Sequence, residues 1–561
     1  MTYDLKILDG TIVDGSGGAR RQGDIGVQKG KIIALGEAPG EARQTLDARG
    51  RVVCPGFVDI HTHYDAQLLW DRAMSISPWH GVTTVVIGNC GFGIAPTRPT
   101  HRDLILRTLE KVEGMSINAL KEGLGNEWAF ETFPEYLDLI ERQGIAINVG
   151  VLLGHTPIRL EVMGEDAVRR VATKQEIEDM SDTIREGMDA GALGFATSHA
   201  PTHHGFDGHP VPSRLASMEE LSELVGAMAE SRRGIMQATV GRTLFHEEFR
   251  SLASQHGIPI TWTALLAGMS GPGSHRRHQE QALELIEDGL NVVPQISCRP
   301  LNFDFDFNSP FVFEMRPLFS PTMKTNQEGR RQIYSDPDFR AAFKKDSDVS
   351  SRNALAGWAE RAVISRAPGH KDKEERLLVD VAAEEGVEPI DLALDLSLES
   401  DFGARFRFPV VNFDENEVEE LLRDPNMLVA LSDAGAHANQ LCDACYSTHL
   451  LGHWVREKAV LELERAVHML TSRPAKVFGI SDRGLLQIGR PADIVIFDPD
   501  TVGAGPLRRV HDLPGGADRL VSDAVGIDAV MVNGTIIRQN GEEIGNGSIF
   551  PGRLLRSGVA T

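Results

Sequence analysis

Two histidines with one residue between them, His61 and His63, directly follow the apolar run Phe57 to Ile60. A short apolar run after Pro55-Gly56 predicts a buried strand, and residues two apart on a strand point to the same side. The two imidazoles are therefore expected to reach a single metal ion, for which histidine nitrogen is a common ligand. A histidine pair in a polar loop is the alternative, and the preceding strand favours the metal site.

A cysteine and an aspartate follow two further predicted strands. Cys90 lies between Asn89 and Gly91 after the second strand, and Asp433 lies in Ser432-Asp433-Ala434-Gly435 after the eighth. In a closed barrel the carboxyl ends of the strands meet at one face. Two histidines, a thiolate and a carboxylate there would hold Zn²⁺ or a similar divalent ion, with one ion per chain. In the alternative interpretation, Cys90 is a small buried hydrophobic residue and Asp433 forms a turn.

This ligand set predicts hydrolysis of an amide-like bond. A divalent ion lowers the pKa of a water molecule to about 7, which makes it a nucleophile near neutral pH. We expect Asp433 to be the catalytic residue as well as a ligand. Its carboxylate would take the proton from the water and pass it to the leaving amine.

Three further histidines near strand ends are candidates for substrate contact. His155 follows the third predicted strand, His199 follows the fourth, and His437 lies just beyond Asp433. For His155, bracing a loop is an equally good interpretation.

Other histidines and cysteines are given no role in the chemistry. His203, His204 and His209 lie in a loop rich in Gly and Pro and are expected to face solvent. Cys442 and Cys445 have the spacing of half a zinc knuckle, but the sequence holds no second pair to complete it. We interpret them as packing residues.

The elements that would position these residues alternate from residue 55 onward. Apolar strand-like runs are followed by longer amphipathic segments, some with capping boxes such as Thr173 with Glu176 and Ser217 with Glu220. About eight such units predict an α/β fold that closes as a (β/α)8 TIM-like barrel rather than an open sheet. The predicted strands are 57–60, 83–87, 147–153, 192–196, 235–238, 258–262, 292–296 and 427–431.

The two ends of the chain have a different pattern. Short β runs divided by Gly and Asp occupy residues 1–54, and β character returns after about residue 484. The simplest organisation is a composite β-sandwich built from residues 1–54 and 484–561, with the barrel at 55–483.

The interval 299–366 interrupts the alternation of strands and helices. It begins with phenylalanines at alternate positions within 302–308 and continues with a run rich in Pro, Arg and Lys. We expect an inserted subdomain over the barrel mouth. Its aromatic residues would pack on the barrel, and a lid that supplies an apolar wall for the substrate is a compatible alternative.

Composition excludes several classes of protein. The chain has 561 residues, 41% hydrophobic content and a formal net charge of -23, which disfavours nucleic acid and anionic membranes as partners. Five scattered cysteines fit a reducing cytoplasm better than a disulfide framework. We see no signal peptide and no apolar run near the roughly 18 residues of a membrane span. The expected protein is a cytoplasmic enzyme, homo-oligomeric, with a small-molecule amide substrate.

Taken together, these motifs resemble the amidohydrolase superfamily, in the branch of the N-acyl-D-amino-acid deacylases, or D-aminoacylases. The resemblance covers nearly the whole chain and implies a metal-bearing TIM barrel, a β-sandwich shared by the termini, an inserted lid and hydrolysis of amide-type bonds. The motifs that carry it are 52–63, Gly88-Asn89-Cys90-Gly91, Gly154-His155, 162–164, 191–194, Ser432-Asp433, 473–476, 489–495 and 532–534.

The sequence also departs from the pattern that this resemblance implies. Family members usually carry a metal-binding histidine at the ends of strands five and six, and the matching segments 236–240 and 261–265 contain none. The matching positions also lack the basic residues that hold the substrate carboxylate, because Leu266 follows strand six and Ala438-Asn439 follow His437. Arg299 or Arg159 would have to replace them as the partner of a carboxylate.

The sequence therefore predicts a metal-dependent amidohydrolase that binds one metal ion. Its substrate is expected to be neutral or bulky and apolar, and the enzyme would cleave an amide bond in it. Three alternatives remain open. The first is an N-acyl-D-amino-acid deacylase that binds its carboxylate with different residues. The second is a cyclic amide or carbamate hydrolase. The third is a non-catalytic, metal-poor homologue that serves as a binding or assembly subunit.

Overall fold

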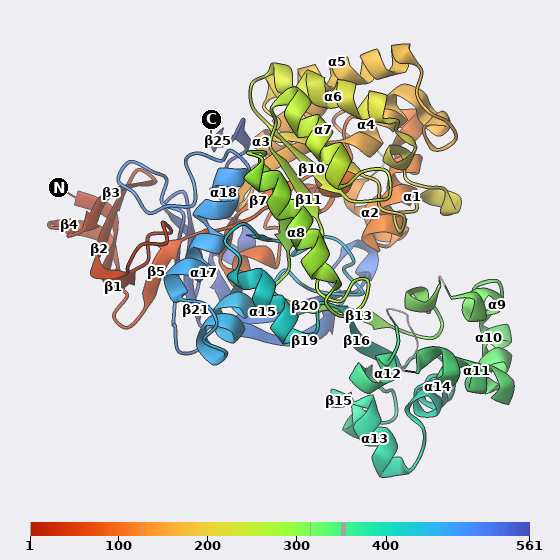
Figure 1. Cartoon of the computed structure of the whole chain (residues 1–561). Coiled ribbons are helices and arrows are strands. Elements are labelled where there is room, and N and C mark those ends of the chain that lie inside the picture. The colour runs from red at the N-terminus through yellow and green to blue at the C-terminus, as the bar shows by residue number, and fades with distance from the viewer. Residues whose placement is uncertain (1, 126, 315, 349–354, 561) are drawn as a thin grey trace.

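The computed structural model describes residues 2–125, 127–314, 316–348 and 355–560, and Figure 1 shows the whole chain. Its centre is an eight-stranded sheet. Each strand pairs in parallel with the next strand of the sheet in sequence order. All eight predicted barrel strands are confirmed. They are β6 (Phe57–Asp59), β7 (Val82–Ile87), β8 (Asn148–Gly154), β9 (Gly194–Ser198), β10 (Ile235–Thr239), β11 (Ile260–Thr263), β12 (Val292–Ile296) and β17 (Leu428–Val429).

The first and last strands meet at the end where the polar residues lie. Thr62 forms a parallel bridge with Ala434, and the His63 backbone N–H donates to the Ala434 carbonyl at 2.7 Å. These contacts close the eight strands into a barrel beyond the carboxyl end of β6. They also place the segments around His63 and Asp433 side by side, although about 370 residues separate them in sequence.

Helices form the outer layer of the barrel, and neighbouring helices in sequence pack on one another (Figure 1). The capping box of Thr173 and Glu176 is present at α5. The second predicted box is only half formed: Ser217 accepts the Glu220 N–H at α6, but the Glu220 carboxylate pairs with Arg159 instead. The helices of this layer are α3 (Phe133–Gln143), α4 (His155–Met163), α5 (Lys174–Ala190), α6 (Met218–Glu230), α7 (His246–His256) and α8 (Ser274–Glu287).

Both termini contribute to one nine-stranded sheet. Its centre is the antiparallel pairing of β5 from the beginning of the chain with β18 from the end, and residues of both ends share one apolar core. We propose that the domain limits at about residues 54 and 484 follow this sheet. Its strands are β1 (Thr2–Ile12), β2 (Arg21–Gln28), β3 (Lys31–Gly36), β4 (Glu41–Asp47), β5 (Val52–Pro55), β18 (Ile494–Phe497), β21 (Ile527–Val532), β22 (Thr535–Gln539) and β23 (Glu542–Glu543).

The inserted segment forms its own sheet and core beside the barrel (Figure 1, green to teal). Strand β16 (Arg405–Val411) pairs with β13 (Leu301–Phe305) and with β14 (Val363–Arg366), which in turn pairs with β15 (Arg376–Leu377). We therefore propose that the insertion runs from about 301 to 411, beyond the expected limit at 366. Residues 315 and 349–354 of the expected interval lie outside the described residues. Its helices are α9 (Ser320–Met323), α10 (Gln327–Ser335), α11 (Pro337–Ser347), α12 (Trp358–Arg361), α13 (Leu378–Glu385) and α14 (Pro389–Glu399).

Most aromatic residues of the insertion pack on one another and not on the barrel, which corrects that expectation. Phe303 is the exception, because its ring lies 6.2 Å from that of His437 between centroids. Phe305 and Phe307 lie 5.4 Å apart between ring centroids and belong to a buried cluster with Trp358 and Phe406. This cluster is separate from the barrel core. Because the segment has enough aromatic residues to build a core of its own, it has no need to bury them against the barrel.

A separate hairpin near the C-terminal end of the chain also belongs to the fold. The strands β19 (Gly503–Val510) and β20 (Arg519–Val525) form an antiparallel hairpin, which lies near the inserted sheet (Figure 1). In the described part of the chain, no helix is long and apolar enough to cross a membrane.

Candidate metal centre and catalytic cavity

A cavity of about 410 Å³ lies at the carboxyl ends of the barrel strands, and we call it the catalytic cavity. Segments after seven strands and helix α1 (Arg102–Glu113) contribute to its walls. Its polar side chains include four histidines, one cysteine and three carboxylates: His61, His63, His203, His437, Cys90, Glu113, Asp433 and Asp443. Its apolar wall includes Phe92, Val112, Val240, Leu266, Met269, Leu301 and Leu431.

Four predicted ligands converge at the bottom of this cavity. The donor atoms of His61, His63 and Cys90 all lie within 4.8 Å of one another. Cys90 Sγ is 3.4 Å from His61 Nε2. One carboxylate oxygen of Asp433, Oδ1, lies 3.4 Å from His61 Nε2 and 3.8 Å from His63 Nε2. The structure thus brings together every residue that the sequence predicted as a metal ligand.

In both candidate ligand histidines, His61 and His63, the Nδ1 atom lies close to an oxygen of another side chain. His61 Nδ1 lies 2.7 Å from Gln295 Oε1, at hydrogen-bonding distance. His63 Nδ1 lies 3.1 Å from Glu113 Oε1, although both atoms lack hydrogen-bond geometry to any described residue. An acceptor at Nδ1 favours the tautomer whose Nε2 lone pair is free. Both rings therefore present Nε2 to the common centre.

Cys90 is held in an unusual backbone conformation. Its φ of 56° lies in the left-handed region, and its N–H donates to Gln237 Oε1 at 2.7 Å. Burial raises the pKa of its thiol, but the charge interaction with His61 and the hydrogen bonds with His61 and His63 outweigh burial and lower the pKa to about 7. The thiolate, which is the form that binds metal, is therefore accessible near neutral pH.

Several residues that line the cavity have left-handed backbone conformations. Leu431, Asp433 and His437 have φ values of 67°, 45° and 48°, and all three line the cavity, as does Cys90. Non-glycine residues in this region cost about 1–3 kcal/mol each and persist where the surrounding structure fixes them. The strain supports a functional role for this end of the barrel.

The residues present fit a divalent metal ion. Two imidazole nitrogens, a thiolate and a carboxylate are four donors of the types that Zn²⁺ binds. His61 and His63 are buried and are fixed by Gln295 and Glu113 on the side away from the centre. Among the described residues, this is the one group of three or more His, Cys, Asp or Glu side chains compact enough to hold an ion.

Strands five and six offer hydroxyl groups where the resemblance would place histidines. Thr239 and Thr263 end β10 and β11 and line the cavity. Thr263 Oγ1 donates to Thr239 Oγ1 at 3.3 Å, so the two hydroxyls partly satisfy one another. Neither strand therefore supplies a strong donor for a second ion.

Of the four predicted substrate contacts, only His437 lines the catalytic cavity. His155 is fully buried, with Nδ1 2.8 Å from Thr197 Oγ1 and Nε2 2.9 Å from Glu220 Oε1. Since both ring nitrogens are bound within the protein, His155 braces the ends of the strands. The expectation of substrate contact is corrected accordingly.

His199 and Arg299 are also turned away from the cavity. His199 Nδ1 lies 2.8 Å from Thr243 Oγ1, and the side chain is buried. Arg299 Nε donates to Asp443 Oδ1 at 2.9 Å, and both side chains are buried. Asp443 lines the cavity and Arg299 does not. Arg299 therefore neutralises Asp443 from behind and does not offer a free cation to a substrate.

Three cavity residues were missed by the sequence analysis. Glu113 is the last residue of α1, and Asp443 belongs to the loop after Asp433; neither follows a strand, so no pattern marks them. His203 was expected to face solvent, but its ring packs on Phe92 at 5.2 Å between centroids and its Nδ1 lies 2.7 Å from Ser198 Oγ. Burial, together with charge repulsion from other histidines, lowers the pKa of His203 to about 3, so it is neutral at physiological pH.

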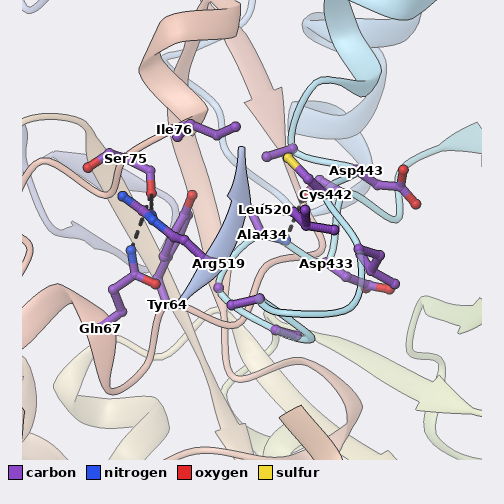
Figure 2. Close-up of a pocket in the computed structure, with 16 residues that line it drawn as sticks. Tyr64, Gln67, Ser75, Ile76, Asp433, Ala434, Cys442, Asp443, Arg519 and Leu520 are labelled. Carbon is purple, nitrogen blue, oxygen red and sulfur yellow. Dashed lines mark hydrogen bonds between the residues drawn. The ribbon is translucent and has the colours of Figure 1, made fainter. Parts of the chain in front are cut away.

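A much smaller cavity of about 30 Å³ lies on the other side of Asp433 and Asp443, and Figure 2 shows its lining. Gln67 and Arg519 both donate to the Ser75 carbonyl, at 3.2 and 2.8 Å, at one end of it. Its volume is enough for one or two water molecules. Asp433 thus lies between this space and the catalytic cavity.

A closed parallel barrel with a compact His, His, Cys and Asp centre at the carboxyl ends of its strands defines a metal-dependent hydrolase. The model of the amidohydrolase family matches residues 44–292 and 336–538. The chain belongs to the amidohydrolase family, in the D-aminoacylase branch, and is a metal-dependent hydrolase of carbon–nitrogen bonds other than peptide bonds.

The relatives cover almost the whole chain. A D-aminoacylase from Alcaligenes xylosoxydans xylosoxydans is 30% identical over 540 residues, which are 96% of this chain and 95% of the relative. An N-acyl-D-glutamate deacylase from the same organism is 28% identical, with 99% and 96% covered. The crystal structure of an N-acyl-D-glutamate deacylase from Bordetella bronchiseptica, complexed with zinc and a phosphonate inhibitor, is 27% identical with a TM-score of 0.68 and covers 99% of this chain and 100% of that one.

Proposed function

We propose that this protein uses one divalent metal ion to hydrolyse the amide bond of an uncharged, largely apolar substrate. The observation that carries the proposal is the charge of the catalytic cavity. Among the described residues that line it there is no Lys or Arg, while Glu113, Asp433 and Asp443 are carboxylates. A substrate with a free carboxylate would find no guanidinium fork there, because the nearby Arg299 is already paired with Asp443.

We assign His61, His63, Cys90 and Asp433 as the residues that hold the ion. When bound, a divalent ion supplies Lewis-acid chemistry, which polarises a carbonyl and makes water nucleophilic near neutral pH. Zinc is the preferred candidate because the donor set suits it and because the Bordetella bronchiseptica deacylase was solved with zinc. The threonines on strands five and six, in place of histidines, support one ion per chain.

In this proposal Asp433 is the catalytic residue. Its carboxylate accepts a proton from the attacking water, whose oxygen forms the new bond to the amide carbon. The carbon–nitrogen bond then breaks, and the same proton passes from Asp433 to the leaving amine. His437 and the neutral His203 both line the cavity and offer hydrogen-bonding groups to the substrate.

A second candidate is deacylation of N-acyl-D-amino acids, in which the substrate keeps its carboxylate. It is supported by the relatives, whose names give D-aminoacylase and N-acyl-D-glutamate deacylase activity. In this case the substrate carboxylate would have to lie outside the catalytic cavity or accept hydrogen bonds from His437 and His203. Cyclic amide and carbamate hydrolysis use the same machinery and remain predictions.

The experiment compares N-acetyl-D-leucine with its primary amide, N-acetyl-D-leucinamide, on the zinc-loaded protein. Masking the carboxylate is expected to raise kcat/KM for release of acetate at least tenfold, because it removes a charge that the cavity does not neutralise. The L enantiomers, measured in parallel, establish the stereochemistry. Preference for the free acid would overturn the proposal in favour of the second candidate.

Two other expectations are proposals of the same kind. The five cysteines of the chain are free and buried, which supports a reducing, cytoplasmic location. The expectation of a homo-oligomer is tested by light scattering on the purified protein.

A further inference from the structure

A second large cavity, of about 250 Å³, lies between the inserted sheet and the β19–β20 hairpin. We call it the arginine cleft. The whole chain carries a formal charge of -23, yet four arginines and one histidine are among the ten residues that line this cleft. They are Arg366, Arg405 and Arg407 from the inserted sheet and Arg509 and His511 from the hairpin and its end.

The alternation of β16 explains one wall of the cleft. Phe406 and Phe408 point into the apolar core of the insertion. Residues two apart on a strand share a face, so Arg405 and Arg407 both lie on the opposite face and line the cleft. A sheet face that carries two arginines beside one another faces this cavity.

The hairpin supplies the other wall by the same rule. Leu507, Arg509 and His511 are two residues apart and line the cleft. Arg508 points to the other side, where it pairs with Asp523 at 2.9 Å. Guanidinium groups from two separate parts of the chain therefore converge on one space.

Carboxylates in and around the lining already pair with three of the four arginines, Arg405, Arg407 and Arg509. Asp304 is buried and already accepts from Arg405, Arg509 and Ser365. Glu375 pairs with Arg407 from the rim, where its side chain is 55% exposed. Asp306 and Asp518 also pair with Arg405 and Arg509, from positions outside the lining.

Arg366 remains available for a ligand. Within the ranges that the structure describes, its side chain forms no hydrogen bond or ion pair. The side chains of Arg405, Arg407 and Arg509 are only 16–17% exposed. Their electrostatic attraction for an anion is therefore screened less than on an open surface.

We propose that the arginine cleft is a binding site for a small molecule with two or more oxyanion charges. Guanidinium groups bind carboxylate and phosphate oxygens with paired N–H donors. The cleft is large enough for a dicarboxylate or a small phosphorylated compound. This inference does not rest on the proposed function, because the site lies outside the catalytic cavity and its occupancy is measured without substrate.

The site is connected to the catalytic cavity through one loop. Arg405 Nη2 and Arg509 Nη2 both donate to the Asn439 carbonyl, at 3.5 and 3.1 Å. Asn439 is two residues from His437, which lines the catalytic cavity. An anion that draws these guanidinium groups toward itself would therefore act on the loop that carries His437.

Isothermal titration calorimetry of the full-length, metal-loaded protein with potassium phosphate and with potassium succinate, at constant ionic strength, tests the site. We expect saturable binding of at least one of the two probes. The tighter probe identifies whether phosphoryl or carboxylate groups are preferred. No saturable binding of either probe would overturn the proposal.

Two variants locate the binding. Arg366→Gln and Arg407→Gln are each expected to weaken binding at least tenfold, and Arg508→Gln on the opposite face of the hairpin is the matched control. The melting temperature of each variant shows that it is folded. Equal affinity in all three variants would place the anion elsewhere, for example at the metal centre, and would also overturn the proposal.

Discussion

The catalytic cavity and the arginine cleft have volumes of about 410 and 250 Å³, and they are lined by different kinds of charged side chain. In its described lining the first has three carboxylates and no guanidinium or ammonium group. The second has four arginines and two carboxylates. The loop that holds His437 and Asn439 lies between them. The fold thus separates the metal chemistry from the recognition of anions.

The different charged residues of the two cavities can be explained by the chemistry proposed for each. In the proposed metal centre, carboxylates would supply a ligand and lie against the Nδ1 atom of a histidine. Arginines placed in the same cavity would compete with the metal for Asp433 and for the thiolate of Cys90. The insertion, with its separate core, can accommodate arginines at no cost to the centre. The predictions below test how completely the two functions are separated.

The largest effect is expected from Asp433→Asn. The amide cannot take a proton from water, so kcat should fall by about 10²–10⁴-fold, the usual contribution of a general acid or base. Steady-state kinetics and elemental analysis of the same sample check this. Unchanged turnover with metal present would remove Asp433 from the catalytic role, and loss of the metal alone would reduce it to a ligand.

A smaller effect is expected when the partner of a ligand is removed. Gln295→Leu deletes the acceptor at His61 Nδ1, so zinc affinity should fall about 10–100-fold. Gln295→Glu keeps an acceptor and should retain affinity, which a general loss of stability would not explain. Competition with a chromogenic chelator measures the affinity, and Gln279→Leu on the half-buried surface of α8 serves as control. Equal affinity in Gln295→Leu and the control would show that His61 needs no partner.

The difference in charged side chains between the two cavities can be removed by placing a cation in the catalytic cavity. Leu266 lines the catalytic cavity at 7% exposure, and Leu266→Lys would place an ammonium group there. A hydrogen bond to a charged group contributes about 1.5–3 kcal/mol, so the preference for N-acetyl-D-leucinamide over the free acid should shrink by about 10–100-fold. Leu266→Met, of similar volume, should leave the preference unchanged. If Leu266→Lys leaves it unchanged as well, charge does not decide the choice of substrate.

The sequence was sufficient to predict the barrel and the convergence of the four candidate ligands, because both depend on where the apolar runs begin and end. The apolar runs had the length of strands, and His61, His63, Cys90 and Asp433 immediately follow strand ends. Parallel strands of a closed barrel bring such residues together whatever their separation in sequence.

The residues that were missed depend on tertiary packing. Glu113 ends a helix, and His203 lies in a loop whose polar composition predicted exposure. His155 follows a strand as a catalytic residue would, but the Glu220 carboxylate from α6 binds its ring. The proposed extent of the insertion rests on the pairing of β13 with β16, about 100 residues later. No pattern within a window of the sequence contains these contacts.

The smallest expected effect is also the most direct comparison of the two cavities. Raising the salt concentration from 0.05 to 0.5 M shortens the Debye length from about 14 to about 4 Å. Phosphate or succinate binding in the arginine cleft should weaken several-fold, because charge attraction provides most of it. Hydrolysis of the uncharged N-acetyl-D-leucinamide in the catalytic cavity should change by less than about twofold over the same range. If both activities depended equally on salt, the same electrostatic potential would act on both cavities. If neither depended on salt, the cleft arginines would be fully neutralised by their carboxylate partners.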